Sequence, residues 1–178
     1  DARRGLRAIA AVQELEALTI AVVHGHAIGG GFGIMLACDF RIVAVSPQTP
    51  LKNHSRPQDD AVISVPEIDL GIPLAWGLTA LLRDEVGPAN AKVIIALGEP
   101  VPLDQALRIG LVQYVVDKGE LEVHTSALID KLLKKESVAL HMVKSQFGAL
   151  AARARYDSLF RATTHCNALL SETERVSG

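Results

Sequence analysis

The chain has 178 residues, of which 49% are hydrophobic and 21% charged, and its formal net charge at pH 7 is -2. This composition is typical of one globular domain that is large enough to bury a core. Lysine and arginine form no cluster that would indicate nucleic-acid binding, and the longest apolar stretch is far shorter than a membrane span. We therefore expect a soluble protein, of the cytoplasm or of an organelle matrix, with no nucleic-acid partner.

The first part of the chain has the pattern of an α/β unit. Residues 1–18 carry apolar side chains at every third position, as in an amphipathic helix. A run rich in β-branched residues at 19–24 predicts a strand, the glycine-rich segment 25–33 predicts a turn, and residues 34–38 predict a short helix. Residues 40–44 predict a second strand, which completes the order strand, turn, helix, strand.

The rest of the chain changes from strands to helices. The polar segment 45–58 contains three prolines and predicts a surface loop, and residues 61–65 predict a strand that Pro66 ends. Further helices are predicted at 76–85, 88–97 and 103–109, a last strand at 111–116, and helices with breaks near 136–137 and 152 over 121–174. No internal repeat is present, so we expect a mixed α/β fold.

The stretch GHAIGGGFG, residues 25–33, places five glycines between a strand and a helix. Its spacing does not fit the dinucleotide fingerprint, and it lacks the lysine and hydroxyl residue of a P-loop and the serine of a nucleophile elbow. Glycines that leave backbone N–H groups open at a helix N-terminus can bind a phosphate or an oxyanion forming on a carbonyl. A tight packing turn is the alternative, and the residues alone leave both open.

The cysteines and histidines give no sign of a metal centre. Cys38 and Cys166 lie far apart in apolar or helical surroundings, and we interpret both as reduced thiols of a reducing compartment. His24 and His26 flank a glycine but have no third ligand at a suitable spacing, so structural roles are favoured. We therefore expect no metal site.

Three blocks of sequence carry a family resemblance. They are TIAVVHGHAIGGGFGIMLACDFRIVA at 19–44, AVISVPEIDLGIP at 61–73 and GPANAKVIIALGEPVPLDQALRIGLVQYVV at 87–116. In this order they resemble the enoyl-CoA hydratase/isomerase, or crotonase, family, and the resemblance extends over nearly the whole chain. It implies an α/β spiral of repeated ββα units over residues 1–116, with 45–58 as an inserted loop. It also implies a C-terminal helical region, 117–178, that assembles trimers and covers the acyl pocket.

The resemblance also implies the chemistry and its residues. The substrate would be an acyl-CoA thioester, with no further cofactor, and the protein would form a homotrimer or a dimer of trimers. Two backbone N–H groups of the family hold the thioester oxygen as an enolate forms. One of them carries over to Gly30. The other belongs to the family's N-terminal part, which we expect to be missing from a chain that begins at Asp1 without a methionine.

Glu67 matches the family's second catalytic glutamate. A carboxylate just after a strand end and near an apolar pocket can pass protons to and from carbon. From the residues alone, a glutamate after a proline in a turn is more often a surface or helix-start residue. The remaining positions that the resemblance places against substrate are Ala27, Ile28, Gly29, Gly31, Gly33, Pro66 and Leu70.

Gly33 stands where hydratases of the family carry their first catalytic glutamate. Glycine neither donates a proton nor orients water, so two-carboxylate hydration is not expected. We favour an isomerase-like reaction in which Glu67 alone moves a proton from C2 to C4 of a 3-enoyl-CoA. Hydration and acyl-CoA binding without catalysis are the alternatives, and Asp69 is either a substitute acid or, as we favour, a cap of the following helix.

A few other side chains have two interpretations each. Phe32 and Trp76 are predicted to line a pocket or to belong to the core. Lys144, Arg153 and Arg155 lie in predicted late helices, where a solvated face is the default and contact with CoA phosphates is the alternative.

Overall fold

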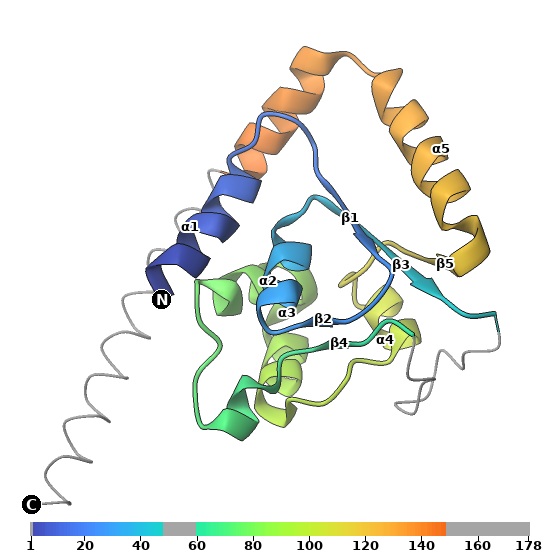
Figure 1. Cartoon of the computed structure of the whole chain (residues 1–178). Coiled ribbons are helices and arrows are strands. Elements are labelled where there is room, and N and C mark those ends of the chain that lie inside the picture. Colours follow the sequence, from blue (N-terminus) through green and yellow to red (C-terminus); the bar gives the residue numbers. More distant parts are fainter. Residues whose placement is uncertain (1, 48–59, 149–178) are drawn as a thin grey trace, which may run out of the picture.

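The structure is a computed structural model that describes residues 2–47 and 60–148 (Figure 1). In chain order its elements are α1 (Ala2–Gln13), β1 (Ile20–Val23), β2 (Ala27–Ile28), α2 (Gly30–Ala37), β3 (Phe40–Val45), β4 (Ile63–Ser64), η1 (Pro66–Leu70), α3 (Leu78–Leu97), α4 (Leu103–Arg108), β5 (Tyr114–Asp117), η2 (Lys118–Glu120) and α5 (Leu121–Leu133). Residues 137–148 are also helical. The fold is therefore of the mixed α/β class that the sequence predicts.

Two small parallel sheets form the centre of the molecule. In the larger sheet β3 lies between β1 and β5, and Val43 pairs with Val23 on one side and with Val115 on the other. In the smaller sheet β2 pairs with β4, with Ala27 opposite Ile63. Because β3 is covered on both faces, its residues 41–45 are all buried, as is usual for parallel strands.

Helix α2 is the central helix and packs against α1, α3, β1 and β2 (Figure 1). Its sequence is apolar on almost every side, and Phe32, Met35 and Leu36 are buried in the main hydrophobic cluster. A short helix with this composition is stable only when neighbours cover it. The ends of α2 are therefore fixed by the surrounding core, and the glycine turn stands at its N-terminal end.

The strand boundaries differ from the predicted ones in two places. No strand is predicted at Ala27–Ile28, yet these residues pair with Ile63–Ser64, which are all that remains of the predicted strand 61–65. The last strand is predicted from residue 111 but begins at Tyr114. Leu111 and Val112 are instead buried beside α4, and the Val112 N–H donates to the carbonyl of Ala106, so these residues are not free to join a sheet.

The helix boundaries follow the glycines and prolines. Gly87 has non-helical backbone angles inside α3, so a second helical segment begins at Pro88, as predicted. Helix α5 ends at Leu133 and the next helix starts at residue 137, which confirms the predicted break between them. The predicted break near 152, most of the predicted loop 45–58, and Arg153, Arg155 and Cys166 lie outside the described residues.

No helix of residues 2–47 and 60–148 combines the length and the apolar composition that crossing a membrane requires. This agrees with the absence of a long apolar stretch in the sequence.

Candidate functional site

The glycine turn gives α2 an open N-terminal end. Gly29 has φ 53° and ψ -113°, a conformation that side chains disfavour, and its N–H donates to the carbonyl of Ser64 in β4 at 3.3 Å. Helix α2 begins at Gly30, and the first N–H groups of a helix have no acceptor within the helix. The Gly30 N–H has no acceptor among the described residues, and both Gly30 and Gly31 are exposed. The turn therefore presents a backbone donor at the positive end of a helix.

The smaller sheet brings Glu67 to this turn. Since β2 and β4 are parallel, the residues that follow them lie at the same edge: the glycine turn after β2, and η1 after β4. Glu67 is the second residue of η1, and its Oε1 lies 3.3 Å from the position that a Cβ on Gly29 would occupy. A larger residue at Gly29 would therefore meet the carboxylate as well as a strained backbone.

The Glu67 carboxylate is not satisfied by the surrounding protein. Its Oε2 is buried and has no hydrogen-bond partner in the described part of the chain. A buried polar atom without a partner costs free energy, and most folded proteins hold few of them. A buried, unpartnered carboxylate oxygen beside an exposed N–H donor is typical of an acid/base group that faces a substrate.

The structure gathers most of the predicted substrate-contacting positions around this turn. Ile28, Gly30 and Gly31 are exposed on it, Gly29 and Pro66 are partly buried, and Leu70 at the end of η1 is 72% exposed. Ala27 differs, because it is buried in β2 and its N–H donates to the carbonyl of Val62. Ala27 therefore packs in the core and holds the start of the turn in place.

Gly33 faces the core. A Cβ on Gly33 would stand 2.9 Å from Leu78 Cδ1 and 3.2 Å from Ile9 Cδ1, and Gly33 is itself buried. The side-chain direction at this position leads between α1 and α3, whereas Glu67 lies against Gly29. Glycine at residue 33 allows the three helices to pack closely.

This packing gives a stability prediction for Gly33→Glu. The new carboxylate would have to displace Ile9 and Leu78, which are 0% and 1% exposed, and would lose its hydration. We expect the free energy of unfolding to fall by at least about 2 kcal/mol, as measured by urea denaturation. Exposed Ile34→Glu, one residue further along α2, is the control and should cost less. Equal stability of the two variants would contradict this packing.

Two predictions for residues near the turn have different outcomes. Asp69 is not a cap of α3, because the residue before that helix is Gly77 and no side chain caps it, so this prediction was wrong. Asp69 instead lies exposed inside η1.

Phe32 is fully buried and Trp76 is partly buried against the core, close to Gly30. Sequence reasoning missed Gly5, whose lack of a side chain makes room for the Trp76 ring.

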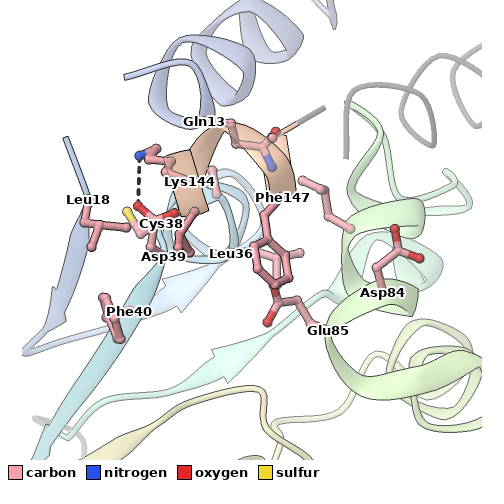
Figure 2. Close-up of a pocket in the computed structure, with 14 residues that line it drawn as sticks. Gln13, Leu18, Leu36, Cys38, Asp39, Phe40, Asp84, Glu85, Lys144 and Phe147 are labelled. Carbon is pink, nitrogen blue, oxygen red and sulfur yellow. Dashed lines mark hydrogen bonds and ion pairs between the residues drawn. The ribbon is translucent and has the colours of Figure 1, made fainter. Parts of the chain in front are cut away.

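A cavity of about 550 Å³ lies at the other end of α2 (Figure 2). The prediction that Lys144 faces solvent was wrong, because this residue is only 5% exposed. Its Nζ donates to Asp39 Oδ2 at 2.8 Å and to the carbonyl of Ala17 at 2.7 Å. Asp39 also accepts from the N–H and the hydroxyl of Thr19. Lys144 thus attaches the helix of residues 137–148 to the core.

Cys38 lines the same cavity and is partly buried. Burial raises the pKa of its thiol, and its Sγ lies 3.4 Å from the Ile34 carbonyl, to which it donates. A neutral thiol is a poor nucleophile and a poor metal ligand. Its surroundings therefore agree with the interpretation of Cys38 as a reduced, unreactive thiol.

The two histidines beside the glycine turn are exposed. His24 precedes the turn and His26 lies within it. Within residues 2–47 and 60–148 no three His, Cys, Asp or Glu side chains are grouped closely enough to hold a metal ion.

Comparisons with known proteins relate this chain to a family. The family model described as enoyl-CoA hydratase/isomerase matches residues 3–175. The chain is 32% identical over 141 residues to "Crotonyl-CoA hydratase" of Syntrophomonas wolfei, covering 79% of this chain and 49% of the relative. It is 35% identical over 130 residues to "Short-chain-enoyl-CoA hydratase" of Clostridium acetobutylicum, and the match covers 73% of this chain and 44% of the relative. The chain thus spans about half the length of the curated relatives it matches.

Solved structures are similar over more of the chain. Pseudomonas aeruginosa DspI is 31% identical with a TM-score of 0.72, and the match covers 95% of this chain and 59% of DspI. An enoyl-CoA hydratase from Mycobacterium avium subsp. paratuberculosis is 27% identical with a TM-score of 0.78, and the match covers 94% of this chain and 64% of that protein. These similarities confirm the crotonase-like α/β fold class that the sequence predicts.

Proposed function

Because the chain belongs to the enoyl-CoA hydratase/isomerase family, we propose that it carries an isomerase-like site for an enoyl-CoA thioester. Glu67 is the acid/base residue, and the Gly30 N–H binds the thioester oxygen. The observation that supports this most directly is the Glu67 carboxylate, which lies against Gly29 with one oxygen buried and without a partner among the described residues. The exposed N–H donor of Gly30 is on the next residue of the same turn.

The reaction needs one base and one oxyanion donor on this chain. The Glu67 carboxylate takes a proton from C2 of a 3-enoyl-CoA, and the electron pair of that C–H bond forms a dienolate whose charge lies on the thioester oxygen. The Gly30 N–H and the positive end of α2 stabilise this oxygen. The protonated Glu67 then returns its proton to C4, which leaves the double bond between C2 and C3 and consumes no water.

Hydration is the second candidate, since the relatives that are 32% and 35% identical are named as hydratases. Adding water across a double bond in the family manner calls for a second positioned acid/base group. Gly33 has no side chain to supply it, and its side-chain direction leads to Leu78 and Ile9. Proton transfer by Glu67 alone fits these residues better.

The exposed apolar surface of the C-terminal helices supports a proposed assembly into trimers. Large apolar side chains are exposed on α5 and on residues 137–148: Val123, Leu133, Val138 and Phe147 are 72%, 77%, 69% and 70% exposed. Exposed apolar surface of this kind is typical of protein interfaces. A homotrimer or a dimer of trimers, with acyl-CoA as substrate and no further cofactor, completes the proposal.

Product analysis distinguishes the candidate functions. The purified protein is incubated separately with a 3-enoyl-CoA and with the matching 2-enoyl-CoA, and the thioesters are separated by chromatography. We expect each double-bond isomer to form from the other, with little 3-hydroxyacyl-CoA. Faster formation of 3-hydroxyacyl-CoA would identify a hydratase instead. Saturable acyl-CoA binding without any product would identify a non-catalytic member of the family.

A further inference from the structure

Trp76 has an unusual backbone conformation next to the glycine turn. It is the only tryptophan of the chain. Its φ is +60°, and no other non-glycine residue in the described part of the chain has a positive φ. A bulky side chain in this region is disfavoured relative to ordinary backbone. Strain of this kind is retained where the position of the side chain is needed, and it is frequent at functional sites.

The indole ring of Trp76 is held between two helices by glycines on both sides. Its Cη2 and Cζ3 lie 3.3 Å and 3.4 Å from the position of a Cβ on Gly30, at the start of α2. On the side of α1, its Cε2 and Nε1 lie 2.1 Å and 2.5 Å from the position of a Cβ on Gly5. The ring therefore lies against the backbone of α1 as well as that of α2, and movement toward α1 is blocked.

The ring and the Glu67 carboxylate flank the same turn. The side-chain direction of Gly29 leads to Glu67 Oε1, and that of the next residue, Gly30, leads to the Trp76 ring. The exposed Gly30 N–H lies between them in the chain. A thioester that accepts a hydrogen bond from this N–H, with its C2 beside Glu67, therefore has the indole close to its reacting carbons.

We propose that Trp76 is a specificity-determining residue that forms a rigid wall of the acyl subsite and selects straight-chain over branched enoyl groups. This inference rests on the proposed function, because it takes the thioester oxygen to bind at Gly30. A flat aromatic surface packs well against an unbranched chain. A branch beside the reacting carbons would have to displace the ring, and the backbone of Gly5 prevents that displacement.

Tryptophan fluorescence tests this placement without any need for turnover. Because Trp76 is the only tryptophan, emission excited at the long-wavelength edge of the absorption, where the two tyrosines absorb little, reports on this ring alone. The protein is titrated with saturated hexanoyl-CoA, which has no double bond to isomerise, and separately with free CoA. We expect hexanoyl-CoA to change the emission saturably and free CoA to leave it unchanged. Hexanoyl-CoA binding, shown by calorimetry, without a change in emission would overturn the proposal. Absence of hexanoyl-CoA binding would overturn it together with the proposed function.

Trp76→Phe tests the selectivity. The smaller ring leaves space beside Gly30. The measured quantity is the kcat/KM for a 3-enoyl-CoA with a methyl branch at C4, divided by the kcat/KM for the straight-chain 3-enoyl-CoA. We expect this ratio to rise about tenfold. Tyr114→Phe changes an aromatic residue of β5 that packs against His124, and it is expected to leave this ratio unchanged, because β5 belongs to the larger sheet and not to the one that carries the glycine turn. An unchanged ratio in Trp76→Phe would show that the ring does not limit the acyl group.

The two experiments separate the inference from the proposed function. If the protein isomerises no 3-enoyl-CoA but hexanoyl-CoA changes the Trp76 emission, the catalytic proposal fails and the acyl-binding wall stands. If isomerisation is observed but neither the emission nor the selectivity responds, the proposed function stands and Trp76 is a structural residue.

Discussion

Replacing Glu67 by glutamine is expected to lower kcat for isomerisation of a 3-enoyl-CoA by about 10²- to 10⁴-fold, the usual contribution of a positioned acid/base group. Glutamine has nearly the shape of glutamate but neither takes a proton from carbon nor returns one. The measurement is the initial rate of 2-enoyl-CoA formation at saturating substrate. Since the carboxylate oxygen Oε2 has no partner to lose in residues 2–47 and 60–148, the fold should be kept.

Asp69→Asn is the matched control for this experiment. Asp69 lies two residues further along η1 and carries the same kind of side chain, but it is exposed. We expect this variant to retain the rate of the unaltered protein and Glu67→Gln to lose it, with hexanoyl-CoA binding similar in both. If instead Asp69→Asn removes the activity, the exposed carboxylate supplies the proton and the assignment of Glu67 is wrong.

The sequence was sufficient to predict the parts of the site that depend on neighbours in the chain. The glycine turn follows from five glycines between a strand and a helix, but the helix begins at Gly30, four residues before the predicted start at residue 34. The position of Glu67 beside it depends on the two-residue strands β2 and β4, which are too short to give a periodic pattern. Only the family resemblance connected these two segments before the structure did.

Long-range contacts explain the wrong prediction for Lys144 and the part of the Trp76 placement that the sequence did not predict. Lys144 has the sequence surroundings of an exposed helical residue, yet it is buried because Asp39, 105 residues earlier, accepts its ammonium hydrogen bond. Trp76 was predicted only as a pocket or core residue, because its position depends on the missing side chain of Gly5 in α1. No local pattern around either residue contains its partner.

Arg41 is a buried charged residue with a large expected effect on stability. It lies in β3, is 1% exposed, and its Nη1 donates to the carbonyls of Cys38 at 3.0 Å and Leu36 at 3.4 Å. These carbonyls belong to the C-terminal end of α2, where a helix has no donors of its own and where a positive charge is favourable. Its Nη2 also forms an ion pair with the Glu85 carboxylate.

Arg41→Ala is therefore expected to lower the free energy of unfolding by about 3–5 kcal/mol, from buried carbonyls left without a donor and from the cavity that remains. Urea denaturation measures this change. The control is Arg83→Ala, since Arg83 is about half-exposed and pairs only with the neighbouring Asp84 among the described residues. It should alter stability by no more than about 0.5 kcal/mol.

Arg41→Lys separates the positive charge from the geometry of the guanidinium. A lysine keeps the charge at the end of α2 but cannot reach two carbonyls and Glu85 with a planar fork of donors. We expect its stability to lie between those of the unaltered protein and Arg41→Ala. Equal stability of the lysine and arginine proteins would show that charge alone is required there. Equal loss in the lysine and alanine variants would assign the whole effect to the hydrogen bonds that fix the end of α2 opposite Gly30.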